Sequence, residues 1–331
     1  MLETKITKEL KKRKNLLAFS AGGDSTALFF LLIHRQIDFD IAIVDYNIRE
    51  QSKEEVAYAK ELAKKYHLKC HTLKADTIHQ NFESNAREIR YNFFEKLISE
   101  YQYDNLLTAH HLGDRFEWML MQFCKGAGCV ELIGMQSIEK RDGFKIIRPL
   151  LHLDKSELLN FLHLHSIKYF EDESNNDEKY KRNSFRHNHT KPLLDKYLQG
   201  IKKSFSYMDE DRANLIQEID IKKVEDFAYF KSSNNKRADI FAIDRYLKTG
   251  LYMPTAHERE MLKSEKTVVL GRKIIVNQEH GFVFIAPFES KTLTMPKEFK
   301  EEMRRLKIEP KLRAFFYTNP QAFQKIKELI L

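Results

Sequence analysis

Several features that mark secreted and membrane proteins are missing from this sequence. Its 331 residues include only three cysteines, Cys70, Cys124 and Cys129, and no two of them form a C-x-x-C pair. An odd, scattered set of this kind predicts neither a disulfide framework nor a zinc ribbon. No apolar stretch approaches the roughly 20 residues of a membrane helix, and the N-terminal MLETKITKELKKRKN lacks the apolar segment of a secretory signal. We therefore expect a cytoplasmic protein with no membrane partner.

Two common nucleotide-binding fingerprints are absent as well. The Walker A loop requires G-x-x-x-x-G-K-S/T, and dinucleotide-binding folds carry G-x-G-x-x-G; the sequence contains neither. It also shows no internal repeat and no extended low-complexity tract.

An excess of positive charge is present instead. The net charge is +8 and the isoelectric point is near 9.1. Lysine and arginine side chains placed against phosphates release condensed counterions, so this balance favours a polyanion such as nucleic acid as a partner. Many basic proteins bind no nucleic acid, and composition alone leaves both interpretations open.

Short apolar runs alternate with helix-like segments through the first half of the chain. The runs cover residues 15–19, 39–44, 68–73 and 105–108, and the helix-like segments cover 25–35, 52–66 and 84–100, the last with Ser84 as its N-cap. This alternation predicts an α/β fold in which a parallel, five-stranded sheet has helices on both faces and the first strand lies centrally.

The second half changes in character. A helix is expected from Asp154 to His165, and a lysine-rich helical stretch begins near residue 196. The runs TVVLGRKIIV and FVFIAPF predict a hairpin that turns at residues 277–281, and two short helices are expected around Pro310. We predict a catalytic domain over residues 1–195, a helical linker over 196–235 and a small α+β domain over 236–331.

The most specific local signal is a glycine-bearing corner between the first expected strand and helix. A turn of this kind offers backbone N–H groups to an anion, and the helix N-terminus adds a favourable dipole. Taken alone, the corner is equally compatible with an ordinary strand–helix turn. Its residues are Ser20, Ala21, Gly22, Gly23, Asp24 and Ser25.

This corner resembles the pyrophosphate loop of the N-type ATP pyrophosphatases, which split ATP into AMP and pyrophosphate. Further blocks follow in order: residues 86–91 (AREIRY), 108–117 (TAHHLGDRFE), 148–151 (RPLL), 171–175 (EDESN) and 182–186 (RNSFR). In this order and spacing they are similar to the tRNA(Ile)-lysidine synthetases over residues 15–195. Asp45-Tyr46-Asn47 departs from the usual Asp-His-Gly, Gly113 from a frequent aspartate, and Trp118 from a usual threonine.

The resemblance implies a ligase that forms a carbon–nitrogen bond. ATP would adenylate O2 of the wobble cytidine in a CAU-anticodon tRNA(Ile), and free L-lysine would displace AMP at C2. The corner would bind ATP, Asp24 and Asp114 would hold Mg²⁺, and Arg90 and Arg182 would stabilise the phosphates. Arg87 and Arg186 are equally compatible with phosphate contacts and with structural ion pairs.

The lysine substrate carries two ammonium groups, so its pocket should be acidic. Asp114 and Glu117, three residues apart on one helical face, suit that role. Only the neutral amine attacks, and His110 is a candidate base because an unperturbed histidine has a pKa of about 6.5. For His111 we favour a hydrogen-bonding role at the strand end. The basic run 181–189, with interleaved aromatics, suits contact with the tRNA.

Two other functions are compatible with parts of the sequence. A tRNA thiolase would share the pyrophosphate loop, although Cys124 and Cys129 are a poor substitute for a reactive cysteine pair. A basic RNA-binding protein without catalysis would share the charge but would not need Asp24, Asp114 and Glu117. The sequence leaves the oligomeric state open, a homodimer included.

Overall fold

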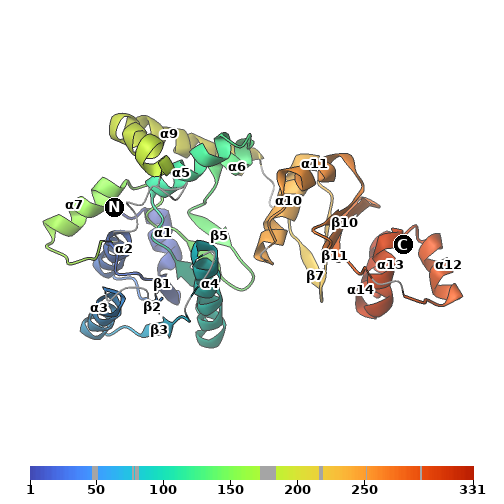
Figure 1. Cartoon of the computed structure of the whole chain (residues 1–331), viewed down its shortest axis with the longest axis horizontal. Helices are drawn as coiled ribbons and strands as arrows, with labels where there is room; N and C mark the ends of the chain where they lie inside the picture. Colours follow the sequence, from blue (N-terminus) through green and yellow to red (C-terminus); the bar gives the residue numbers. More distant parts are fainter. Residues whose placement is uncertain are drawn as a thin grey trace. The chain divides into compact units, whose positions relative to one another are not determined.

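A computed structural model describes residues 1–46, 51–76, 78, 82–171, 184–215, 219–250, 252–290 and 293–331. The chain divides into two compact units, Met1–Arg212 and Ala213–Leu331, each with its own sheet (Figure 1). The functional motifs found in the sequence all fall in the first unit.

The first unit is built on a six-stranded sheet in the order β3-β2-β1-β4-β6-β5. The first five strands of that order are parallel, and β1 lies centrally between β2 and β4, as predicted. β5 adds an edge strand that was not predicted. It is antiparallel to β6 because a short turn joins the two strands, and a short turn cannot make the crossover that parallel strands need. The strands are β1 (Asn15–Ala18), β2 (Asp40–Asp45), β3 (Cys70–Lys74), β4 (Asn105–Leu107), β5 (Ile138–Lys140) and β6 (Lys145–Ile147).

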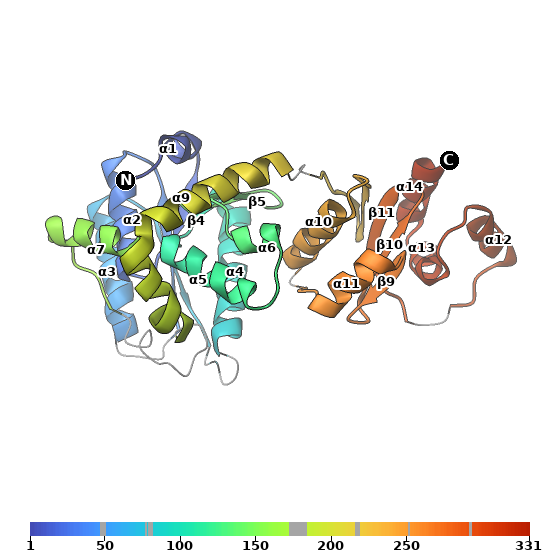
Figure 2. The same cartoon turned by 90° about the horizontal axis from the view of Figure 1, so that it is seen from above.

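Helices cover both faces of this sheet, which confirms the predicted layers. α2 and α3 lie on one side of the strands and α4 on the other in both views (Figure 1, Figure 2). The helical elements of the unit are α1 (Thr4–Leu10), α2 (Gly23–His34), α3 (Gln51–Lys65), α4 (Phe82–Tyr101), α5 (Leu112–Phe123), α6 (Cys129–Ile133), α7 (Lys155–Leu164), the π-helix η2 (Arg186–Thr190) and α9 (Lys191–Leu215).

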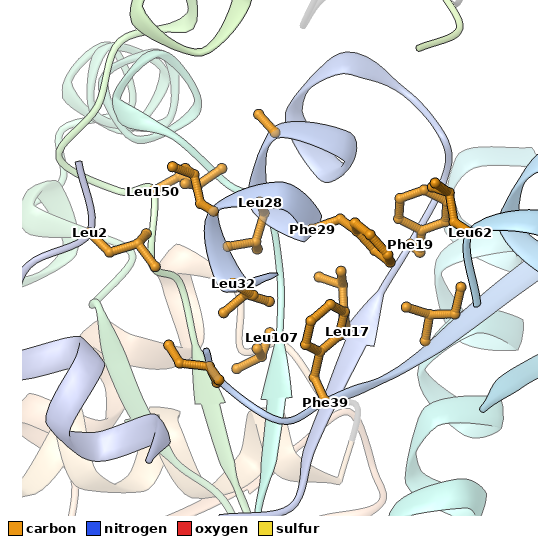
Figure 3. Close-up of a cluster of buried hydrophobic side chains, with 14 of the residues drawn as sticks. Leu2, Leu17, Phe19, Leu28, Phe29, Leu32, Phe39, Leu62, Leu107 and Leu150 are labelled. Atoms are coloured by element: carbon orange, nitrogen blue, oxygen red, sulfur yellow. The ribbon is translucent and has the colours of Figure 1, made fainter. Parts of the chain in front are cut away.

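The centre of the sheet is apolar on both sides. Leu17 on β1 packs into the cluster that contains Phe29 of α2, and Figure 3 shows these side chains beside Leu107 of β4. The preceding residue, Leu16, points to the other face, where it packs with Phe94 of α4. A strand buried on both faces needs consecutive apolar residues, which explains the uninterrupted run at residues 16–19.

Two helix starts that the sequence pointed to, at Ser84 and at Asp154, differ in outcome. α4 begins at Phe82, so Ser84 lies inside its first turn and the prediction of Ser84 as N-cap is wrong. Asp154 does cap α7, accepting a hydrogen bond from the Ser156 N–H while Glu157 accepts one from the Asp154 N–H. This reciprocal capping box fixes where the helix starts.

The second unit is an antiparallel sheet in the order β7-β8-β11-β10-β9, with α10 and α11 packed into one apolar cluster and the C-terminal helices into another. Its elements are β7 (Lys222–Val224), β8 (Phe227–Lys231), α10 (Lys236–Thr249), α11 (Ala256–Ser264), β9 (Thr267–Leu270), β10 (Ile274–Glu279), β11 (Phe282–Pro287), α12 (Lys297–Arg305), the 3₁₀ turn η3 (Pro310–Leu312), α13 (Arg313–Thr318) and α14 (Pro320–Ile330).

Three expectations for this half of the chain need correction. The run TVVLGRKIIV is not one strand but two, because Gly271 takes a φ of +53° and turns the chain between β9 and β10. The tail contains three α-helices rather than two. Among its described residues, the segment expected as a helical linker is helical only in α9, and residues 222–224 and 227–231 form β7 and β8 of the second sheet.

Candidate active site

Two neighbouring parallel strands, β1 and β4, carry the candidate site at their carboxyl ends. Leu17 of β1 is in register with Leu107 of β4, so the segments that follow them emerge side by side. One leads through the glycine-bearing corner into α2, and the other leads through residues 108–111 into α5. Open α/β sheets bind ligands at this edge, and here two helix N-termini meet there.

The corner before α2 is held in shape by its own hydroxyl groups. Ser25 Oγ accepts a hydrogen bond from the Ser20 N–H at 3.2 Å and donates one to the Gly22 carbonyl at 3.1 Å. Ala21 adopts a φ of +59°, and its carbonyl accepts a hydrogen bond from the Phe170 N–H at 3.0 Å. The chain therefore makes a tight reversal whose backbone is fixed on both sides.

The start of α2 keeps its donors available. Gly22 is the N-cap, and among the described residues no side chain caps this helix. The N–H groups of the first helical turn have no intrahelical acceptor, and with the helix dipole they form an anion site. A Cβ atom on Gly23 would lie 3.4 Å from both Leu159 and Tyr169, so the helix start packs closely against the α7 region.

His111 lies between two carboxylates that come from different helices. Its Nε2 atom is 3.8 Å from Asp24 Oδ2 and 3.6 Å from Asp114 Oδ2. Its Nδ1 atom accepts a hydrogen bond from the Gly113 N–H at 3.0 Å, which leaves the ring proton on Nε2 in the neutral imidazole. The ring thus presents an N–H edge toward Asp24 and Asp114.

His110 takes a different position, with Nδ1 2.9 Å from Thr108 Oγ1. Sequence reasoning chose His110 as the base and missed the place of His111 between the carboxylates. The sequence did contain a signal for His111. It directly precedes the helix-like segment that forms α5, which is the position of an N-cap residue.

Arg186 bridges the two acidic residues of α5. Its Nε donates to Glu117 Oε2 at 2.8 Å, and its Nη2 donates to Asp114 Oδ1 at 3.2 Å. Glu117 is only 1% exposed, and its hydrogen bond with the charged Arg186 compensates the cost of burying its carboxylate. The sequence left open whether Arg186 contacts phosphate or forms a structural ion pair, and in the structure it forms ion pairs with Asp114 and Glu117.

The π-helix η2 that carries Arg186 is positioned by α9, which packs alongside α5 (Figure 2). Leu112 and Phe116 of α5 share an apolar cluster with Leu194 and Phe205 of α9. Arg115 of α5 also pairs with Asp209 of α9 through both of its terminal nitrogens, at 2.9 and 2.5 Å. These contacts hold the two helices together, and π-helical turns recur at functional sites.

Of the two arginines predicted to stabilise the phosphates, Arg90 lies on α4 and Arg182 lies outside the described part of the chain. Arg90 lies close enough to Tyr46 to act on its hydroxyl: burial raises the pKa of Tyr46, and the charge of Arg90 opposes that rise. Tyr46 also donates a hydrogen bond to the Ala86 carbonyl at 3.0 Å. Arg87 instead lies 4.8 Å over the ring of Tyr91. Arg182, Asn47 and the segment 172–183 lie outside the described residues.

The acidic residues offer a partial metal site. Asp24 Oδ1 is buried and lacks a hydrogen-bond partner within the described structure, so an oxygen ligand is available there. No group of three or more histidine, cysteine, aspartate or glutamate side chains in the described ranges is arranged for a metal ion. Mg²⁺ is commonly held by one or two carboxylates together with substrate phosphates, and Asp24 and Asp114 fit that pattern.

Comparisons with known proteins show which family the chain resembles. A family model described as the PP-loop domain matches residues 2–193. A tRNA(Ile)-lysidine synthase from Helicobacter pylori (strain ATCC 700392 / 26695) is 43% identical over 309 residues, which covers 93% of this chain and 90% of that protein. One from Campylobacter jejuni (strain RM1221) is 43% identical over 319 residues, covering 96% and 97%.

Among solved structures, the U34-tRNA thiolase NcsA from Methanococcus maripaludis superimposes with a TM-score of 0.52 at 20% identity, over 64% of this chain and 79% of that chain. At this identity the likeness concerns the fold alone. In the described ranges, no helix combines the length and apolar character required to cross a membrane.

Proposed function

The chain belongs to the tRNA(Ile)-lysidine synthase family of PP-loop enzymes, and from this premise we propose that it joins free L-lysine to C2 of the wobble cytidine in a CAU-anticodon tRNA(Ile). It is an ATP-using enzyme that acts on tRNA. As a carbon–nitrogen ligase it changes codon reading from AUG to AUA. The observation that carries the proposal is the meeting of Asp24, His111, Asp114 and Arg186 beside the anion-binding start of α2.

In the first step the wobble cytidine is adenylated. Its O2 atom attacks the α-phosphorus of ATP, the bond to the pyrophosphate breaks, and pyrophosphate leaves. The corner 20–25 binds the departing pyrophosphate through the free N–H groups at the start of α2. Arg90 and Arg182 are proposed to stabilise the charge on the transferring group, which is the usual role of arginine in such sites.

Mg²⁺ is proposed to be held by Asp24 and Asp114. When bound, it neutralises phosphate charge and acts as a Lewis acid at the transferring phosphorus. Within the protein, the placement of both carboxylates depends on His111, which lies between them, and on Arg186, which holds the other oxygen of Asp114.

In the second step the ε-amine of lysine attacks C2. The C2–O2 bond breaks, AMP leaves with the oxygen, and the amine gives up a proton. Asp24, Asp114 and Glu117 bring three carboxylates together with the guanidinium of Arg186, and the proposed Mg²⁺ offsets part of that charge. Asp114 and Glu117 are proposed to attract the ammonium group of lysine. His110 is the candidate to accept the proton, because Nδ1 of His111 is already occupied by the Gly113 N–H, and Asp114 and Glu117 orient the substrate.

The remaining proposals concern the RNA and the assembly. The end of the catalytic domain at residue 195 and the start of the C-terminal domain at residue 236 stay predictions. We also propose that residues 236–331 contact the tRNA, on the grounds of charge and family likeness. The number of copies in the working enzyme, one or two, stays open.

The proposal separates from its alternatives by experiment. A synthase releases pyrophosphate when ATP and the tRNA are supplied and releases AMP only when lysine is supplied as well, whereas an RNA-binding protein without catalysis releases neither. Cys70 is half-buried, and Cys124 and Cys129 are exposed. Replacing all three cysteines by serine should leave the release of AMP intact; its loss, together with thiolation of the tRNA by the unaltered chain, would indicate a thiolase.

A further inference from the structure

Trp118 is the only tryptophan in the chain, and it lies one helical turn beyond Asp114 on α5. Residues four apart on a helix share a face, and long side chains point back toward the helix N-terminus. Trp118 therefore shares a face of α5 with the site carboxylate Asp114. Its exposed fraction of 43% is high for so large an apolar group.

The ring is held in place from one side. Gly134, which ends α6, has a φ of +63°, and a Cβ atom built on it would lie 2.5 Å from Trp118 Cδ1 and 3.0 Å from Nε1. Only glycine allows this approach, because any side chain would displace the indole and would be strained at this φ. One edge of the ring is thus fixed against backbone, while other parts of it are open to solvent.

The same face of α5 continues past Trp118 to a cation. Gln122 follows at the next turn, and Lys125 lies just beyond the helix end, eleven residues from Asp114. Lys125 makes no ion pair with any described residue, and it is exposed. The carboxylate of Asp114, the exposed ring of Trp118 and the cation of Lys125 therefore follow one another along α5 and the turn after it.

We propose that Trp118 is a stacking platform for an unpaired base of the RNA substrate next to the base that reacts. This inference rests on the proposed function, because it takes tRNA as the substrate. Single-stranded RNA is recognised largely by stacking of splayed bases on aromatic side chains, with cations on the backbone phosphates. Lys125 meets a phosphate of the same strand.

The single tryptophan makes a direct test available. The full chain is titrated with a CAU-anticodon stem-loop RNA while tryptophan emission is recorded, and the anisotropy of the labelled RNA is followed in parallel. We expect saturable quenching with the same midpoint as the anisotropy change. Binding seen by anisotropy with no change in emission would overturn the stacking role while leaving the proposed function untouched.

Substitutions separate stacking from simple packing. Trp118→Phe keeps an aromatic face, and Trp118→Leu keeps bulk without one; loss of a stacked base weakens binding by about tenfold or more. We expect the leucine variant to raise the KM for the RNA by that factor with the KM for ATP unchanged, and the phenylalanine variant to lose less. Equal behaviour of both variants, or a parallel rise in both KM values, would contradict the proposal.

A matched control is Tyr101→Leu. Tyr101 is an exposed aromatic residue at the end of α4, which leads to the amino end of β4 and so lies at the opposite edge of the sheet from the site. Its loss should leave stem-loop binding unchanged. If both variants weaken binding equally, the effect is general and the platform is not at Trp118. Failure of lysine transfer with normal quenching would instead count against the proposed function.

Discussion

The imidazole of His111 is turned toward the carboxylates of the site by the backbone of Gly113. The Gly113 N–H donates to His111 Nδ1 at 3.0 Å, and Nε2 then lies 3.6 Å from Asp114 Oδ2 and 3.8 Å from Asp24 Oδ2. Gly113, a departure from the family pattern, is therefore part of the arrangement that joins the ends of β1 and β4.

Gly113→Ala tests whether this arrangement matters. A Cβ atom at residue 113 would lie 2.7 Å from His111 Cε1, so the ring must move away. Because a displacement of about 1 Å in a catalytic site can cost on the order of 100-fold in rate, we expect kcat to fall by about 10- to 100-fold. Alanine favours the helix, so thermal stability should be kept. Wild-type kcat would show that the orientation of His111 is unimportant.

Asp24→Asn tests the assignment of the phosphate corner. The substitution removes the negative charge that Mg²⁺ needs but keeps the side-chain shape, so release of pyrophosphate should fall by at least about 100-fold. The affinity for tRNA, measured by filter binding, should stay close to that of the unaltered chain. Asp38→Asn, in the exposed turn before β2, is a matched control that should change neither quantity. A loss of tRNA affinity in Asp24→Asn would give the corner a different role.

Glu117→Gln tests the acidic face of α5. The amide keeps the size of Glu117 but weakens its charged hydrogen bond with Arg186 and removes one negative charge from the site. A hydrogen bond to a charged group contributes about 1.5–3 kcal/mol, so loss of the proposed contact between Glu117 and the substrate ammonium should raise the KM for lysine by about 10- to 100-fold. Formation of the adenylated RNA, assayed without lysine, should change much less. Equal losses in both assays would remove the assignment of Glu117 to lysine binding.

The salt dependence of RNA binding tests the meaning of the +8 net charge. Each phosphate neutralised by lysine or arginine releases counterions, so the logarithm of the binding constant should fall linearly with the logarithm of the salt concentration, by roughly 0.7 to 0.9 per phosphate contact. We expect a slope that corresponds to several contacts. An affinity for tRNA that stays flat as salt is raised would mean that the positive charge does not face the RNA.

The layers of the first unit were predictable because β1, β2 and β4 are apolar runs between helix-like segments. Leu16 and Leu17 point to opposite faces, and helices cover both. The sequence prediction missed the hairpin of β9 and β10, although Gly271, Arg272 and Lys273 interrupt the apolar pattern of TVVLGRKIIV. The structure shows a tight turn there, because Gly271 and Arg272 both take a positive φ, of +53° and +55°.

The site could be predicted in its parts but not in its pairings. The motifs identified Asp24, Asp114 and Glu117 as functional candidates, and the structure brings Asp24 and Asp114 together around His111. Arg186 is 69 residues from Glu117 in the sequence, and its contact depends on how α9 packs against α5. The choice between His110 and His111 likewise depends on backbone geometry, since neighbouring residues of the same type carry the same chemical signal.

The most direct test of the account supplies the purified chain with ATP, isotopically labelled lysine and a transcript of the CAU-anticodon tRNA(Ile), followed by nuclease digestion and mass analysis of the anticodon. The account predicts label on the wobble nucleotide, one AMP and one pyrophosphate for each lysine transferred, and no transfer when ATP is omitted. Release of AMP without label in the RNA, or label at any nucleotide other than the wobble cytidine, would contradict it.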